Sequence, residues 1–392
     1  MMDERYAAAG LEALARYGEL PGPLTADPHR WYTSLRDGAP VHPATLPDGR
    51  RVWVVTTADA AASVFTDRRF SNDPAHRAGV GVFDGHRHMG IADPPDHRRL
   101  RGVVARHFAA PQIARLRSRV TEVVDDLLSG VDGDVDLVAD VAAVLPLRVM
   151  FGLFGVPDEE QDRYLAPLVA ASNGDTGRLA RVRDDLAELV ERRAAEPGDD
   201  VLSTLVRARD VDGTLSDGEV TATVFLLLSA GHETVVSLVT VGVYTLLRHE
   251  RQLKALREHP GLIPTAIEEI LRFEPTASHS TGRYATQDVD LAGVTIPAGD
   301  LVLVNLAAVN RDPTLNEDPQ RFDVTRESPR HHAFGRGRHL CLGAPLARLE
   351  AEIALTRLLA TYRDIRPGAE GAAWRVEPGL RGLASFPVTV TR

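Results

Sequence analysis

The stretch FGRGRHLCLG, residues 334–343, contains the only cysteine of this 392-residue chain. Cys341 stands between closely spaced glycines and beside a histidine and two arginines. A single cysteine excludes an intramolecular disulfide, so the thiol is not part of a cross-linked scaffold. A pattern typical of a long amphipathic helix begins directly after it. The sulfur therefore lies near unpaired backbone N–H groups and the positive end of a helix dipole, which favour the thiolate.

A thiolate in this position can be a nucleophile or a metal ligand, and a thiol there can also be a buried structural group. A thiol hydrolase would need an activating base, and His339 is the candidate. A zinc site of the finger type needs several Cys and His ligands, which one cysteine cannot supply. One thiolate is enough for haem iron, because four in-plane nitrogens already hold that metal. Gly335, Gly337 and Gly343 would then let the backbone turn tightly and approach a flat macrocycle.

The composition is that of an ordinary soluble protein, with 44% hydrophobic and 26% charged residues. A net charge of −10 makes nucleic acid and anionic lipid poor partners for the whole molecule. The N-terminal segment has acidic residues and no apolar core, so it does not resemble a signal peptide. The longest apolar stretch contains His232 and Glu233, which are costly in lipid, so it predicts a buried helix. We expect a cytoplasmic protein with no membrane span and no nucleic-acid partner.

Helical patterns dominate the chain. The longest covers residues 216–249, and Ser216 with Glu219 forms a capping box at its start. Asp93 and Pro94 are suited to begin another helix. Further predicted helices cover residues 93–108, 113–131, 178–196 and 343–362, and predicted strands lie within 49–57, 288–308 and 383–390. The fold class is therefore mainly α with small β-sheets. We expect a single catalytic domain over residues 1–392, with an N-terminal extension at about 1–24.

The window around Cys341 resembles the haem-binding loop of the cytochromes P450. The family pattern Phe-Gly-x-Gly-x-His-x-Cys-x-Gly is matched by Phe334, Gly335, Gly337, His339, Cys341 and Gly343. The resemblance extends over nearly the whole chain, from about residue 25 to the end. It implies the P450 fold, with the long central helix lying over the haem, and haem b whose iron is ligated by the Cys341 thiolate.

The central helix carries AGHET, from Ala230 to Thr234, which is similar to the oxygen-activation segment of this family. The resemblance implies that Ala230 lets the helix approach the haem closely. It also implies that Thr234 donates a hydrogen bond to bound dioxygen and that Glu233 helps to bring protons from solvent. The alternative is a buried helix with a tolerated polar interruption.

Two further groups of charged residues match family positions. The resemblance places the haem propionates against His97, Arg101, Arg283 and His339. It also implies a buried Glu–Arg–Arg cluster that supports the haem loop, made of Glu269, Arg272 and Arg321. Each of these side chains could instead be an ordinary surface charge.

The substrate pocket is expected from family positions. The segment 77–95 occupies the place of the variable substrate-contacting loop, and His86 and His88 within it are interpreted as solvated rather than metal-binding. The segment between Pro157 and Pro197 is short for the two lid helices of this family, so how the pocket closes is left open. The expected substrate contacts are Phe83, Leu226, Ser229, Ala230, Thr276, His279, Ser280 and Ala384.

The resemblance implies a haem-thiolate monooxygenase that oxidises a small organic molecule by hydroxylation, epoxidation or oxidative coupling. Its electrons would come from NAD(P)H through a ferredoxin reductase and a ferredoxin, and natural-product tailoring is the expected role. The alternatives are an H2O2-driven peroxygenase and a non-catalytic haem-binding sensor or carrier. Residues 97–121 hold seven arginines and no acid, and Arg336 and Arg338 flank the loop. We interpret these cations as a docking patch for an acidic ferredoxin, with a solvated helix face as the alternative.

Overall fold

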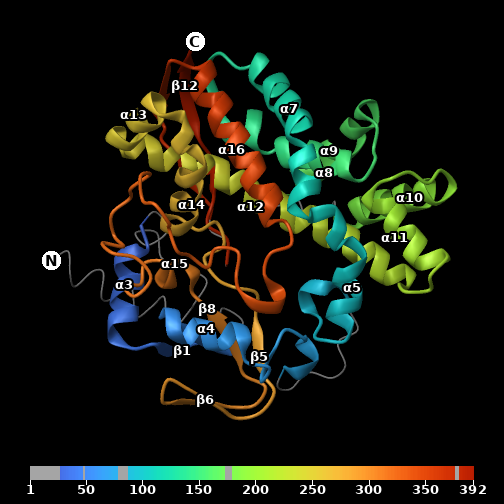
Figure 1. Ribbon diagram of the computed structural model, residues 1–392, viewed down its shortest axis with the longest axis vertical. Helices are drawn as coiled ribbons and strands as arrows, with labels where there is room; N and C mark the ends of the chain where they lie inside the picture. The colour runs from blue at the N-terminus through green and yellow to red at the C-terminus, as the bar shows by residue number, and fades with distance from the viewer. Residues whose placement is uncertain (1–26, 47–48, 78–86, 173–178, 376–378) are drawn as a thin grey trace. The chain divides into compact units, whose positions relative to one another are not determined.

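The computed structural model describes residues 27–46, 49–77, 87–172, 179–375 and 379–392 (Figure 1). Its contacts divide the chain into two compact units, which are described one at a time. Unit 1 contains Met1–Asp84, Arg248–Cys341 and Trp374–Gly382, and unit 2 contains Gly85–Leu247, Leu342–Ala373 and Leu383–Arg392. The expected N-terminal extension lies outside the described residues, and the expectation of a single domain remains a prediction.

Unit 1 is built on a five-stranded sheet in the order β1-β2-β8-β5-β3. Its strands are β1 (Val41–Thr45), β2 (Arg51–Val55), β3 (Phe70–Ser71), β5 (Arg283–Ala285) and β8 (Leu301–Val304). β2 and β8 run parallel with Val52 opposite Leu301, and the remaining pairs are antiparallel. Buried valines of this sheet pack with Phe65 of helix α4 (Ala58–Thr66) into one apolar core. That core fixes the position of α4, whose residue Phe65 lies against the loop that carries Cys341.

The other elements of unit 1 surround this sheet. A separate hairpin is formed by β6 (Val289–Leu291) and β7 (Val294–Ile296). The helices are α3 (His29–Gly38), α13 (Glu250–Glu258), α14 (Ile263–Phe273) and α15 (Leu306–Val309). Short 3-10 turns cover Pro74–His76, Pro260–Leu262 and Gly337–His339. The short strand β10 is Ala373–Trp374, of which only Trp374 belongs to unit 1.

Unit 2 is mostly helical. Its helices are α5 (Asp96–Val104), α6 (Ala110–Arg115), α7 (Arg117–Ser129), α8 (Leu145–Leu153), α9 (Asp158–Ser172), α10 (Leu179–Ala195), α11 (Val201–Asp210), α12 (Asp217–Arg248) and α16 (Ala344–Thr361). Shorter turns are η2 (Met89–Ile91), η3 (Ala105–Phe108) and the π-helix η4 (Leu137–Ala142). β4 (Gly133–Asp136), β12 (Pro387–Thr391) and β9 (Asp364–Pro367) form an antiparallel sheet, and β11 is Leu383–Ser385.

Helix α12 is the central element of unit 2. Its residues Val235–Val243 are buried without interruption, as expected for a helix that is apolar nearly all round. It is long and apolar enough to cross a membrane, but 61% of the most apolar stretch is buried inside the structure. The predicted capping box is confirmed, because the Ser216 backbone N–H donates to Glu219 (2.9 Å) and the Glu219 N–H donates to the Ser216 hydroxyl (3.3 Å).

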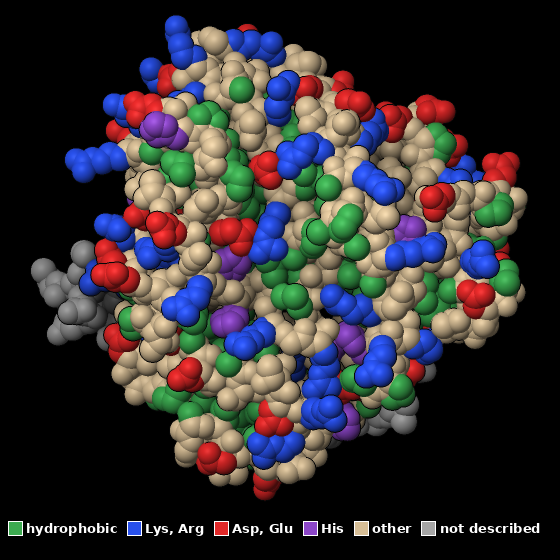
Figure 2. Space-filling view, viewed as in Figure 1, with side chains coloured by type: hydrophobic (Ala, Val, Ile, Leu, Met, Phe, Trp, Pro, Cys, Tyr) green, Lys and Arg blue, Asp and Glu red, His purple; other side chains and the backbone are tan. Residues whose placement is uncertain are grey.

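Ion pairs cover the outer helices of unit 2. On the part of the surface where α10 and α11 lie, basic and acidic side chains alternate (Figures 1 and 2). Arg192 of α10 contacts Glu160 of α9 at 2.7 Å, and Arg209 of α11 contacts Glu191 of α10 at 2.6 Å. Helices α9 and α10 both form within the segment 157–197, although that segment is short for the two lid helices of the expected family.

Several predicted boundaries differ from the observed ones. Asp93 does not cap a helix, because α5 begins at Asp96 with Pro95 in the capping position. The predicted helix 113–131 is broken at Leu116, where α6 ends and α7 begins. The last strand predicted within residues 288–308 does not extend the hairpin. It is β8, which joins the larger sheet beside β2 and β5.

Candidate functional site

The loop that carries Cys341 is closed on itself within unit 1. The Cys341 backbone N–H donates to the carbonyl of Phe334 (2.9 Å), and the N–H of Leu340 donates to Gly337 (3.1 Å). The N–H of Gly335 donates to the carbonyl of His332 at 2.8 Å. Cys341 is exposed at the end of this closed loop, so the backbone presents the thiol on the surface of unit 1.

The glycines of the loop have different roles. Gly335 and Gly337 adopt φ of 69° and 77°, in the left-handed region that side chains disfavour. A Cβ at Gly337 would also lie 2.6 Å from the carbonyl oxygen of Phe65, the penultimate residue of α4. Gly343 is the N-cap residue of α16 and adopts φ −80°, outside the left-handed region. It therefore does not provide the tight turn that was expected there.

Arg283 and Phe65 lie beside this loop. Arg283 is 3% exposed on β5, and its guanidinium lies 5.8 Å from the ring centroid of Phe65. It donates to the Thr281 hydroxyl at 3.0 Å. His339 ends the 3-10 turn of the loop and is half-buried, as is Phe334. Unit 1 therefore brings together the thiol and one buried cation among the residues expected to hold the cofactor.

The remaining expected cofactor-binding and catalytic residues lie on two helices of unit 2. His97 and Arg101 are one turn apart on α5; His97 is buried and Arg101 half-buried. Ala230 is exposed on α12, and Glu233 and Thr234 are half-buried. The Thr234 hydroxyl donates to the carbonyl of Ala230 at 2.8 Å. This bond within the helix leaves the Thr234 oxygen as an acceptor for another donor.

His232, which was not predicted to have a role, contacts Glu233, one of the two predicted catalytic residues. Its Nε2 lies 2.8 Å from the carbonyl oxygen of Ala143, and its Nδ1 lies 3.6 Å from Oε1 of Glu233. The ring is buried, so it is not a surface side chain of the central helix. The motif AGHET contains this residue, but a pattern alone does not show which way an imidazole points.

The expected substrate contacts of unit 2 are only partly described. Phe83 and His86 lie outside the described residues. A Cβ at Gly90 would lie 3.7 Å from Leu226 of α12, so the segment 87–91 packs against that face. His88 is half-buried, and its Nδ1 accepts from the backbone N–H of Gly90 (3.2 Å). Burial lowers the pKa of His88, so the prediction of a solvated loop histidine is wrong at this position.

The other expected substrate contacts have local partners. Ser229 is exposed on α12 and Ala384 on β11, both in unit 2. In unit 1, Thr276 is buried, and burial lowers the pKa of His279 to about 4, which keeps its ring neutral. The Ser280 hydroxyl donates to the carbonyl of Thr281 (3.0 Å) and accepts from the N–H of Val304 (3.2 Å). Its hydroxyl is thus already bound by its own unit.

The buried Glu–Arg–Arg cluster exists, but its third member is not Arg321. Glu269 and Arg272 are fully buried and 2.6 Å apart. The second cation beside Glu269 is Arg326, with Nε at 3.3 Å. Arg321 is 62% exposed, and its side chain binds Asp323 at 2.9 Å. Only its backbone reaches the cluster, because its carbonyl accepts from Arg272 (3.0 Å) while its side chain stays in solvent.

The predicted cationic patch is smaller than the count of arginines indicates. Arg99 is held by Glu219 (2.6 Å) and Asp96 (3.1 Å), and these hydrogen bonds raise its pKa further. Arg117 is paired with Glu352 at 3.0 Å, and Arg119 is paired with Asp158. Arg106 is exposed and donates to the Thr204 hydroxyl at 2.8 Å. Arg98 and Arg115 are exposed, and we take them as the arginines of this segment best placed to meet an acidic partner.

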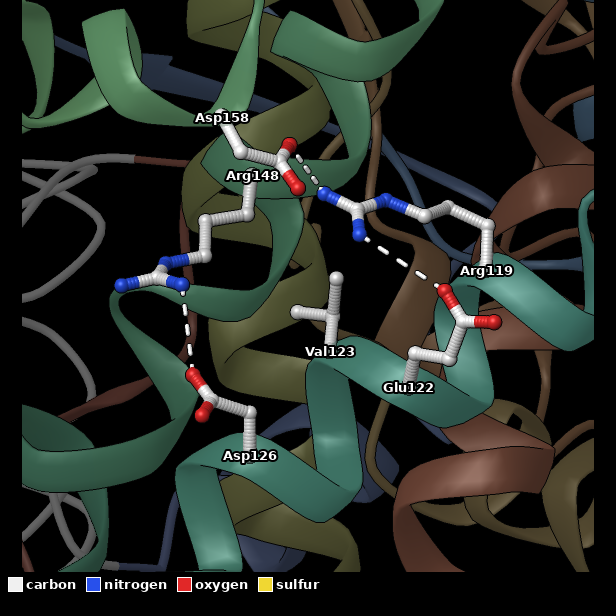
Figure 3. A pocket seen from close by; sticks show the side chains of 6 residues that line it. All are labelled: Arg119, Glu122, Val123, Asp126, Arg148 and Asp158. Carbon is white, nitrogen blue, oxygen red and sulfur yellow. Dashed lines mark hydrogen bonds and ion pairs between the residues drawn. The ribbon is translucent and has the colours of Figure 1, made fainter.

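A surface hollow of about 300 Å³ lies between α7, α8 and the start of α9 (Figure 3). Its arginines face its acids: Arg148 contacts Asp126 at 3.3 Å, and Arg119 contacts Glu122 at 3.7 Å (Figure 3). The residues that line it are Arg119, Glu122, Val123, Asp126, Arg148 and Asp158. None of them is an expected catalytic, cofactor-binding or substrate residue, so the hollow is not a candidate active site.

Comparison with known proteins gives a consistent result. The sequence model of the family described as "Cytochrome P450" matches residues 261–368. The chain is 40% identical over 385 residues to the vitamin D(3) 25-hydroxylase of Pseudonocardia autotrophica, covering 94% of this chain and 95% of that one. It is 39% identical to the cytochrome P450 monooxygenase PikC of Streptomyces venezuelae, covering 95% and 93%. The solved structure of PksS, a bacillaene polyketide synthase cytochrome P450 of Bacillus subtilis, matches with TM-score 0.88 at 31% identity, covering 95% and 99%.

Proposed function

The chain belongs to the cytochrome P450 family of haem-thiolate monooxygenases, and on that premise we propose that it transfers one oxygen atom from O2 to a small natural product. The observation that carries this proposal is the closed glycine loop that presents the only cysteine of the chain. We further propose that the enzyme works in the cytoplasm and that a ferredoxin with its NAD(P)H-dependent reductase supplies the electrons.

The residues present fit haem. Cys341 offers an exposed thiol, and as the only cysteine it is the iron ligand. Gly337 lets the loop lie directly against the backbone of Phe65. The buried guanidinium of Arg283 lies over the aromatic ring of the same residue. We propose that cationic side chains bind the haem propionates. The residues assigned to contacts with the macrocycle are Phe334, Gly335, Gly343 and Ala230. The propionate-binding residues are His97, Arg101, Arg283 and His339.

When bound, a thiolate-ligated haem would supply the reductive activation of O2, from which one oxygen atom is transferred. The chain supplies the protons and their path. Glu233 is half-buried on α12 and so can exchange protons with solvent while facing the interior. Thr234 donates its own hydroxyl proton to Ala230, so its oxygen can accept the next proton donor. These two residues form the proposed proton path.

The substrate is proposed to be an apolar, polycyclic or macrocyclic natural product. Vitamin D3 hydroxylation and polyketide biosynthesis in the names of the similar proteins support this class. Leu226, Ser229 and Ala230 form an exposed or half-buried, mainly apolar face on α12. Thr276, His279, Ser280, Ala384 and Phe83 remain predicted contacts. Because the polar groups of His279 and Ser280 have local partners, we expect shape and apolar area to dominate recognition.

The ferredoxin is proposed to bind near Arg98 and Arg115. The chain is acidic overall, so a small exposed cationic area can orient an acidic partner and raise its association rate. Arg98→Glu is expected to slow reduction by ferredoxin at low ionic strength and to reduce its dependence on salt. Stopped-flow reduction at several salt concentrations measures this. Identical rates for the variant and the wild type across the salt series would contradict the docking site.

The ligand assignment is tested with the ferrous–CO complex. The wild type should show the long-wavelength Soret band of thiolate ligation, and Cys341→Ser should lose that band and most activity. Leu340→Ser is a matched control, because it places the same side chain next to the thiol on an exposed residue. It should keep the band. A wild-type CO spectrum like that of a histidine-ligated globin would refute the proposal.

A further inference from the structure

His232 is held in a fixed orientation on α12. Its Nε2 lies 2.8 Å from the carbonyl oxygen of Ala143, at the C-terminal end of η4. A carbonyl oxygen can only accept, so Nε2 carries a proton and donates it to this bond. The titrating nitrogen is therefore Nδ1, which lies 3.6 Å from Oε1 of Glu233. The two side chains are only 6% and 16% exposed, so water screens their interaction poorly.

We propose that His232 and Glu233 form a dyad that shares one proton and supplies it to the reaction. This inference rests on the proposed monooxygenase function, since it identifies the source of the protons that pass along α12. His232 is then a positioning and proton-storing partner of the catalytic carboxylate.

The number of shared protons follows from the geometry. With no shared proton, the Nδ1 lone pair faces a carboxylate, and the two repel in a largely buried place. With two protons on the pair, an imidazolium faces a neutral carboxylic acid, and the attraction between opposite charges is lost. With one, either an imidazolium contacts a carboxylate or a neutral imidazole contacts a neutral acid, and both arrangements are favourable.

The surroundings of the dyad support storage at this position. At the η4–α8 junction, His232 contacts the uncharged carbonyl oxygen of Ala143. The side chain of Met150 of α8 lies 3.8 Å from the place where a Cβ at Gly231 would stand. Thr234 follows Glu233 in the chain, and its oxygen is an acceptor. When the dyad gives its proton to a hydroxyl or a water, neutral imidazole and carboxylate remain. One proton from solvent restores the dyad through the partly exposed Glu233, and no electron moves in either step.

The coupling is tested without turnover by nitrogen NMR of histidine in the ferrous–CO holoenzyme, which is diamagnetic. The His232 signals are those that disappear in His232→Gln. Nε2 should stay protonated across the titration. Nδ1 should lose its proton at higher pH in the wild type than in Glu233→Gln, by about one pH unit, a tenfold change in proton affinity. Equal midpoints in the two proteins, or an unprotonated Nε2, would overturn the dyad.

The role in proton supply is tested with the same variant. In His232→Gln the amide can still donate to Ala143, but the side chain at position 232 can no longer take up a proton. NAD(P)H oxidation in the ferredoxin-reconstituted system without added substrate should be about tenfold slower, with a larger effect of D2O. His107→Gln is the control, because His107 is half-buried in the same unit and lies on η3, where its Nε2 is 2.8 Å from the Thr204 hydroxyl. A wild-type rate in His232→Gln would overturn the proposal. Absence of the thiolate CO band would instead refute the proposed function, and the titration would still decide the dyad.

Discussion

At position 337 the Cys341 loop touches the rest of unit 1 through its backbone. A side chain there would meet two obstacles. The φ of 77° is disfavoured for any residue with a Cβ, and that Cβ would lie 2.6 Å from the Phe65 carbonyl oxygen. The second obstacle is backbone, which cannot rotate away as a flexible side chain can. Gly337 thus lets the thiol-bearing loop lie against α4.

Gly337→Ala should therefore destabilise the protein and weaken haem retention. Gly371 is a suitable comparison, because it has φ 70° but nothing within 4 Å of its Cβ position. Gly371→Ala should cost about 1 kcal/mol, the strain of left-handed backbone alone. Gly337→Ala should cost about 3 kcal/mol or more, since Phe65 must also move. Urea titration and haem content after gel filtration measure both effects. Equal costs in the two variants would show that the contact with Phe65 does not matter.

The sequence predicts roles for Cys341 and the AGHET segment, because these motifs combine residue types that rarely occur together. It did not identify Arg326 or the orientation of His232. Both Arg321 and Arg326 follow the α14 helix at similar distances, and only the fold decides which one turns inward to Glu269. Likewise, the contact of His232 with Ala143 joins residues that are 89 positions apart, which local patterns cannot reveal.

On the scale of elements, Arg99 joins three segments of unit 2. It contacts Asp96 in its own helix α5, Glu219 in the first turn of α12, and the Thr214 carbonyl (2.7 Å) before that helix. α5 also contacts α11, beside which it lies (Figure 1). The Arg99 bond lowers the pKa of Glu219, so the carboxylate stays ionised. The helix with His97 and Arg101 is thus tied to the start of the helix with Glu233 and Thr234.

This tie predicts a measurable coupling. In a double-mutant cycle with Arg99→Gln and Glu219→Gln, the coupling energy should be about 1 kcal/mol and should decrease with salt. Arg163 and Glu188 form the control pair, with a similar distance of 2.7 Å but exposures of 49% and 50%. Their coupling should be much smaller than that of the Arg99 pair, because water screens an exposed pair. If both cycles gave the same value, partial burial would not strengthen the Arg99 pair.

Predictions for elements were most accurate where a periodic pattern was long. α12 and α16 appear where their long helical sequence patterns placed them, and the α12 cap was readable from Ser216 and Glu219. Breaks between helices were missed, since the sequence 113–131 keeps its helical period across Leu116. The pairing of β2 with β8 was also missed, because these strands are about 250 positions apart and only the tertiary fold joins them.

At the scale of the whole molecule, stability depends on buried ionisable groups in both units. In unit 1, Glu274 contacts His29 (2.8 Å) and Arg381 (2.6 Å), and Arg311 lies 3.8 Å away. Burial alone would raise the pKa of Glu274, but Arg381 and His29 outweigh it and hold the pKa well below its usual range. This cluster ties α3 to the end of α14. In unit 2, Glu350 of α16 is 1% exposed, and burial raises its pKa to about 8.

His29 and Glu350 should make the free energy of unfolding depend on pH in opposite directions. Burial, followed by the charge of Arg311, lowers the pKa of His29 from 6.5 to about 4, so the folded protein keeps the ring neutral. The unfolded chain binds this proton first, and the free energy of unfolding falls as pH drops from 6.5 to 4. For Glu350 the folded protein keeps the proton while the unfolded chain releases it above 4.5. Its contribution to the free energy of unfolding is therefore lost as pH rises from 4.5 to 8.

Two variants separate these contributions. His29→Gln keeps a donor for Glu274 without a titrating ring, so its stability relative to the wild type should increase as pH falls from 6.5 to 4. Glu350→Gln should gain relative stability in the opposite direction, as pH rises from 4.5 to 8. One proton corresponds to a slope of up to about 1.4 kcal/mol per pH unit in each case. Urea titrations across this range measure the two differences, and because both compare a variant with the wild type, the other histidines cancel. A difference that stays constant with pH for either variant would show that the group titrates alike in the folded and unfolded chains.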